Sequence, residues 1–116
     1  MREETGYGER AGERAAELAV HFERGRDYPR AIQYLHQAGE ASAQRNAHQE
    51  AIGHLSRGLE LLKTLPDTPE RTQQELSLQL ALGGLRLATH GFASPEAAQA
   101  FDRARELCEQ IGRAHV

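Results

Sequence analysis

The amino-acid sequence predicts an all-α fold of about five helices, packed as stacked antiparallel hairpins. Two observations favour this fold. The apolar residues of the 116-residue chain are mostly Ala and Leu, a composition that favours helix over sheet. Apolar residues also recur every three or four positions in successive segments, and short turns separate these segments. We expect residues 9–113 to form a single domain.

The first helix is predicted over residues 9–24. Residues 1–8 carry no apolar period, so we expect them to be a disordered leader. Gly25 supplies a stop after the helix. The apolar positions on its one face are Ala15, Leu18, Ala19 and Phe22.

The next two helices are predicted over residues 28–44 and 47–64, with Asp27 and Asn46 as N-caps and Pro66 after the second. RDYPRAIQYLHQA aligns with NAHQEAIGHLSRG at an offset of twenty residues, and SPEAAQAFDRA is a weaker third copy. The matched apolar pairs are Ala31 with Ala51, Ile32 with Ile52, and Leu35 with Leu55. Small residues beside large ones let helices approach closely, so both segments are expected to pack by one pattern.

The last two helices are predicted over residues 69–89 and 95–112, where Thr68 and Ser94 are N-caps followed by proline. Leucines lie on two sides of the first of them. One side has Leu76, Leu80 and Leu87, and the other has Leu78, Leu82 and Leu85. A helix that is apolar on most of its circumference must be covered on most sides, so we expect neighbouring helices there.

Gly83 and Gly84 interrupt the helix over 69–89, and they either weaken it or let a neighbouring helix approach closely. The final helix has a continuous apolar face made of Ala97, Ala98, Phe101, Ala104, Leu107, Cys108 and Ile111. Because Cys108 lies on this face, a packed and inert thiol is expected.

Charge and composition exclude several classes of function. The net charge is −3 and the pI is about 6.1, and no basic face marks a nucleic-acid or membrane surface. The charged N-terminus leads into no apolar run, so neither a signal peptide nor a membrane span is predicted. The single cysteine cannot form an internal disulfide and suits a reducing compartment. These features predict a cytoplasmic protein.

The sequence predicts no catalytic, metal or cofactor site. Its six histidines show no pair at i,i+4 spacing and no cysteine at ligand spacing. Neither Gly83–Gly84 nor residues 6–8 form a phosphate loop between strand and helix. The glutamates stand beside arginines, as on a solvated helix face; examples are Glu13, Glu17, Glu106 and Glu109. The chain is therefore not expected to be an enzyme.

Several of these positions resemble the tetratricopeptide repeat (TPR) family. Leu18, Ala19 and Phe22 sit at the large, small and aromatic positions of that family's first helix. The positions that match its second helix are Ala31, Leu35 and Ala38. The resemblance implies a TPR-like α-α superhelix of stacked hairpins, in an irregular long-helix variant of the family's repeat of about 34 residues.

More specifically, residues 13–112 resemble the helical-repeat region that follows the ATPase module of large bacterial signalling proteins, some with adenylate or guanylate cyclase domains. The matching segments are AELAVHFERGRDYPRAIQYLHQAGE, LPDTPER and ATHGFASPEAAQAFDRARELCEQIG. The resemblance implies a non-catalytic scaffolding module for protein interaction in signal transduction. By analogy with peptide binding in such repeats, the predicted partner-binding residues are Glu13, Ala16, Val20, Glu23 and Arg24.

The expected partner is a protein, a peptide or a neighbouring domain of the same chain. Uncapped faces on the helices over 69–89 and 95–112 also favour a homo-oligomer. Two other functions stay open: a regulatory linker that couples a nucleotide-binding domain to an effector, and a small helical-bundle protein that binds a ligand.

Overall fold

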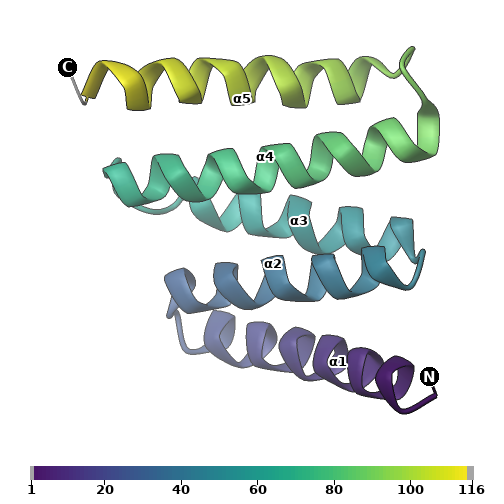
Figure 1. Cartoon of the computed structure of the whole chain (residues 1–116). Coiled ribbons are helices and arrows are strands. Elements are labelled where there is room, and N and C mark those ends of the chain that lie inside the picture. Colours follow the sequence, from purple (N-terminus) through teal and green to yellow (C-terminus); the bar gives the residue numbers. More distant parts are fainter. Residues whose placement is uncertain (1, 115–116) are drawn as a thin grey trace.

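The computed structural model describes the backbone of residues 2–114 and the side chains of residues 10–114. This part of the chain is all-α and contains no strand. Its five helices are α1 (Arg2–Arg24), α2 (Tyr28–Gln44), α3 (His48–Leu62), α4 (Pro69–His90) and α5 (Pro95–Ala114). Successive helices run antiparallel and stack in chain order, with α1 and α5 at the two ends (Figure 1). The predicted all-α fold is confirmed.

The first helix starts earlier than predicted. α1 begins at Arg2, so the backbone of residues 2–8, expected to be a leader, is helical. Apolar periodicity could not mark this segment because it carries none.

Two short turns share one backbone geometry, at residues 25–27 and 45–47. Arg26 and Asn46 take left-handed φ angles of 60° and 61°. The equivalent hydrogen bonds run from the Asp27 N–H to the Phe22 carbonyl and from the Ala47 N–H to the Ser42 carbonyl, both at 2.8 Å. The sequence offset of twenty residues therefore corresponds to two matching turns between α1, α2 and α3.

The helix N-caps follow the sequence prediction at three of four sites. The side chains of Asp27, Thr68 and Ser94 each accept a backbone N–H from the first turn of the following helix. The exception is α3, whose N-cap is Ala47, without a side-chain hydrogen bond. The prediction of Asn46 as N-cap is wrong because this residue occupies the left-handed position of the turn, which asparagine tolerates.

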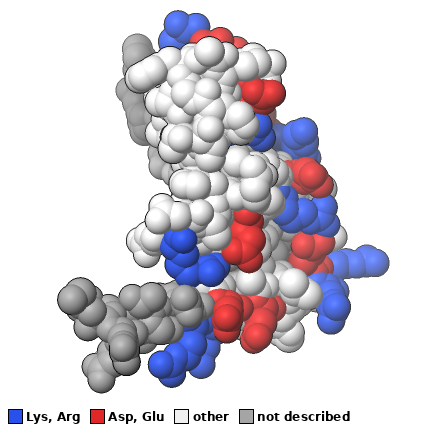
Figure 2. All heavy atoms as spheres, turned by 90° about the vertical axis from the view of Figure 1, so that its right-hand side faces the viewer, with Lys and Arg blue, Asp and Glu red and all other residues white. Residues whose placement is uncertain are grey.

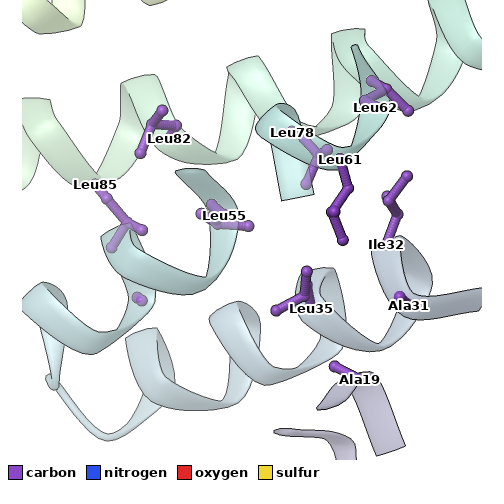
Figure 3. Close-up of a cluster of buried hydrophobic side chains, with 11 residues drawn as sticks. Ala19, Ala31, Ile32, Leu35, Leu55, Leu61, Leu62, Leu78, Leu82 and Leu85 are labelled. Atoms are coloured by element: carbon purple, nitrogen blue, oxygen red, sulfur yellow. The ribbon is translucent and has the colours of Figure 1, made fainter. Parts of the chain in front are cut away.

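The hydrophobic core lies between α2, α3 and α4 (Figure 3). It is closed at one end by Ala19 of α1. Its leucine and isoleucine members are Ile32, Leu35, Leu55, Leu61, Leu62, Leu78, Leu82 and Leu85. Burying one such side chain contributes about 1.5–3 kcal/mol, so these contacts hold the middle of the stack together.

Glycines allow close helix contacts at several levels of the stack. A Cβ at Gly39 of α2 would come within 2.9 Å of Leu55 of α3. A Cβ at Gly83 of α4 would come within 3.0 Å of the Phe101 ring of α5. Gly84, by contrast, has open space beside it. Close approach therefore explains Gly83 and leaves Gly84 without a packing role.

Helix α4 lies between α3 and α5, as its two leucine faces suggested (Figure 1). One face is buried in the core. On the other, Leu80 remains 48% exposed, so the neighbours cover only part of the circumference. No helix in the described part of the chain combines the length and the hydropathy that crossing a membrane requires.

Helix α5 is less buried than its apolar pattern predicted. Only α4 lies beside it among the described helices. Its buried residues are Ala97, Ala100, Ala104 and Leu107. Cys108 is exposed, so the prediction of a packed thiol is wrong. A helix that packs on a single neighbour buries only a narrow stripe, which leaves Ala98, Phe101 and Cys108 accessible.

Candidate interaction surface

The stack has two long faces, which differ in the helices that line them. On one face an ion pair joins Glu23 of α1 to Arg57 of α3. On the other, α2 and α4 lie side by side and border a groove. In α4, Glu75 belongs to the first face and Ser77 to the second, because residues two positions apart in a helix point in nearly opposite directions. We call them the ion-pair face and the groove face.

Two arginines form the ion pairs of this face, and each binds one carboxylate on another helix and one on its own. The pairs are Arg57 with Glu23 and Glu60, and Arg103 with Glu75 (2.8 Å) and Glu106 (3.0 Å). Figure 2 shows the resulting mixture of positive and negative side chains along one edge of the molecule. Arg57 and Arg103 are therefore both paired within the protein.

The hydrogen bonds of these pairs also shift the arginine pKa values. The side chain of Glu23 raises the pKa of Arg57, and that of Glu75 raises the pKa of Arg103. Both guanidinium groups are therefore held in their charged form. Since the arginine side chains are 45% and 39% exposed, solvent weakens the pairs, and they fix surface geometry more than they stabilise the fold.

The groove face carries a shallow groove of about 260 Å³ between α2 and α4. Its lining residues are Ile32, Gln33, His36, Gln73, Gln74, Ser77 and Leu78. The buried side chains of Ile32 and Leu78 form an apolar floor. Among the described residues, no Asp, Glu, Lys or Arg lines this groove. Its polar groups are mainly side-chain amides.

The side-chain amides of the three groove glutamines are available for hydrogen bonding. Gln33, Gln73 and Gln74 form no side-chain hydrogen bond with another described residue. Each amide offers two donors and an acceptor without carrying charge. The other polar residues of the lining are Ser77 and His36, and His36 bonds Glu40 at 2.9 Å on the same helix. The groove can therefore exchange hydrogen bonds with both the N–H and the C=O groups of a bound molecule.

The predicted partner-binding residues of α1 lie away from this groove. Glu23 is committed to Arg57, and Ala16 is half-buried nearby on the same side of α1. Val20 is 48% exposed, and Glu13 and Arg24 are exposed. The five residues are accessible to different degrees, and their role in partner binding stays a prediction.

Glu13 borders a second groove. This groove lies between α1 and α2 and measures about 630 Å³. Its described lining also includes Arg10, Ala11, Arg14, Ala15, Glu17, Leu18, Tyr34 and Gln37. The Tyr34 ring stacks on Phe22 at 5.5 Å, and this contact fixes one wall. Mixed charges line this groove, in contrast to the amide groove between α2 and α4.

Sequence reasoning missed the α2–α4 groove. Three glutamines and a serine in exposed helical positions are an ordinary solvated pattern, so they carry no signal on their own. The groove exists only because α2 and α4 come together across the intervening α3, which periodicity within each helix does not reveal.

Metal-binding geometry is absent from the described residues, in which no group of three or more His, Cys, Asp or Glu side chains could hold an ion. The Nδ1 atom of His48 is buried and finds no hydrogen-bond partner in the described structure. A single imidazole nitrogen without further ligands does not form a site.

Comparison with known proteins gave no match: no protein-family model matches the chain, and no similar curated protein or solved structure was found. The functional interpretation therefore depends on the geometry and chemistry of the two faces.

Proposed function

We propose that the chain is a non-catalytic protein-interaction module that binds a peptide segment of its partner in the α2–α4 groove. The observation that carries this proposal is the set of uncommitted amides of Gln33, Gln73 and Gln74 around an apolar floor. A peptide backbone presents alternating donors and acceptors, and side-chain amides match both. Binding would replace water on amide groups that have no partner among the described residues.

The architecture is consistent with a TPR-like scaffold of irregular repeat length. The N-caps Asp27 and Thr68, which begin the alternate helices α2 and α4, are 41 residues apart (27 to 68). This spacing exceeds the repeat of about 34 residues in the TPR family. We therefore propose a stacked-hairpin relative of that family, acting as a cytoplasmic scaffold of the signalling ATPases that the sequence resembles.

The experiment begins with a selection of peptides from a random display library on the wild-type protein. The affinities of the selected peptides are then measured on a double variant, Gln33→Ala with Gln74→Ala. We expect a loss of about tenfold, since each lost hydrogen bond costs about 0.5–1.5 kcal/mol and 1.4 kcal/mol is a factor of ten. Gln49→Ala, an exposed glutamine near the start of α3, is the matched control and should bind normally.

Two results would contradict the proposal. One is a selection that yields no binder to the folded protein. The other is a set of peptides whose affinity is unaffected by the double variant but falls when Arg57 is replaced, which would assign binding to the ion-pair face.

A further inference from the structure

We propose that a pocket on the ion-pair face binds the phosphate group of a small phosphate monoester through Lys63 and Arg71. The pocket lies between α3, α4 and α5, on the other side of α4 from the amide groove. The site is separate from the α2–α4 groove, so it does not depend on peptide binding there.

Three helices contribute to this pocket, which measures about 280 Å³. Arg71, Glu75 and Gln79 follow one another at spacings of four residues, so they share one face of α4. Arg103 comes from α5. The other lining residues, from the end of α3, are Leu59, Leu62 and Lys63. Small-molecule sites begin at about 300 Å³, so the pocket suits a phosphate group with a small organic part.

Positive charge exceeds negative charge in this lining. The cationic residues are Lys63, Arg71 and Arg103. Glu75 is the only carboxylate among the described lining residues, and its two oxygens bond Arg103 at 2.8 and 3.2 Å. Glu106 also bonds Arg103, at 3.0 Å. Even when both glutamates are counted, one positive charge is left over, in a chain whose net charge is −3.

Lys63 and Arg71 are the cations of this pocket that have no carboxylate partner among the described residues. Arg71 is half-buried, and its Nη1 atom donates a hydrogen bond to the Leu65 carbonyl at 3.0 Å. The other N–H groups of this guanidinium bond no described residue. Lys63 is the only lysine of the chain and is exposed. Both side chains can therefore donate to a ligand.

Arg71 also occupies a position where helix electrostatics disfavour a cation. It lies in the first turn of α4, three residues after the N-cap Thr68. The positive end of the helix dipole favours acidic residues in this turn. A neutral donor such as glutamine could also bond the Leu65 carbonyl. Helix stability therefore does not explain the charge of Arg71, whereas a bound anion would offset it.

The donors of the pocket match a phosphate monoester. Such a group carries about −1.5 to −2 charges at neutral pH and has three strong acceptor oxygens. A guanidinium binds two of these oxygens in parallel, and the Lys63 ammonium adds a second positive charge. The amide of Gln79 adds a neutral donor, and half-buried Leu59 offers an apolar contact to the organic part of the ester.

The test is an NMR titration of the nitrogen-15-labelled full chain with phenyl phosphate, at low ionic strength in a phosphate-free buffer. We expect saturable shifts of the Gln79 side-chain NH₂ and Arg71 Nε–H signals. Arg71→Gln should weaken binding about tenfold, and Lys63→Gln about threefold because Lys63 is more exposed. Arg24→Gln removes an equal charge from an exposed position on α1 and should leave the affinity unchanged.

Benzoate is the matched ligand control, since it carries the same ring with a single charge, and it should bind more weakly than phenyl phosphate. Thermal melting checks that Arg71→Gln folds, and Lys63→Gln changes only an exposed side chain without a described partner. The inference would be overturned by a lack of saturable binding, by equal losses in Lys63→Gln and Arg24→Gln, or by equal affinities for the two ligands. None of these results bears on the amide groove, because neither Lys63 nor Arg71 lines it.

Discussion

The ion-pair face and the groove face are built on the same stack of helices but use their polar residues in opposite ways. On the ion-pair face, Arg57 and Arg103 are each held by two glutamates. On the groove face, the amides of Gln33, Gln73 and Gln74 have no partner among the described residues. The arginines of the first face are therefore paired within the protein, whereas the amides of the second are not paired with any described residue.

The contrast shows that a surface with many charged side chains is not for that reason a binding surface. Charged residues are easily recognised in a sequence, yet exposed charges that pair with each other remain solvated and contribute little. Uncharged amides give no comparable signal, although they are the groups left free to recognise a backbone. The groove face is therefore the better candidate for a specific protein contact.

The largest expected effect on stability is at Leu78, beneath the groove. Leu78→Ala removes a side chain that is 1% exposed and should lower the free energy of unfolding by about 2–5 kcal/mol. Leu80→Ala, on the same helix but 48% exposed, should cost far less. Urea unfolding of both variants checks this difference. Similar losses would show that the floor of the groove is not part of the core.

A smaller effect is expected where a glycine allows two helices to meet. Gly39→Ala would bring a Cβ within 2.9 Å of the buried Leu55 and should destabilise the protein by about 1–3 kcal/mol. Chemical denaturation followed by circular dichroism measures the change. A neutral Gly39→Ala variant would contradict the close approach of α2 and α3.

The two faces can also be compared through Gly53 and Gly84. Both have open space beside them, so Gly53→Ala and Gly84→Ala should each stabilise the protein by about 0.5–1 kcal/mol through helix propensity. Equal stabilisation is expected because neither glycine has a packing role. If Gly84→Ala instead destabilised the fold, Gly84 would have a packing role that its open surroundings do not show.

The smallest expected effect concerns the ion pairs. Arg103→Met should cost about 0.5 kcal/mol, since the Arg103 side chain is 39% exposed in its pair with the less exposed Glu75. The loss should shrink further in high salt, which screens exposed charges. Gln74→Met on the groove face should show no such salt dependence. Thermal melts in low and high salt distinguish the two, and a large salt-independent loss at Arg103 would mean that the ion-pair face supports the core.

The helices themselves were largely predictable from the sequence, because each carries its own apolar period and turn residues. The bounds of α2 match the predicted 28–44, and those of α4 differ by one residue at the end. The errors occurred where local patterns have more than one meaning. Asparagine is common both as an N-cap and in left-handed turn positions, and Asn46 occupies the left-handed position. Cys108 lies on an apolar stripe, but only one neighbour is present to cover it.

The candidate site was not predictable in the same way. The expected binding residues all lie on one helix, α1, where Glu23 forms an ion pair with Arg57. The groove instead combines α2 and α4, whose facing residues are about 40 positions apart in sequence. Recognising it requires the packing of α3 against both helices, which no pattern within a single helix contains.

We propose that the amides of the groove face bind the partner, and nitrogen-15 NMR can observe these amides directly. The measurement is a titration of the labelled protein with a peptide selected on the wild type, following the side-chain NH₂ signals. We predict that the signals of Gln33, Gln73 and Gln74 shift together and saturate, while that of Gln49 stays in place. Saturable binding that leaves the three groove signals unchanged would contradict the claim.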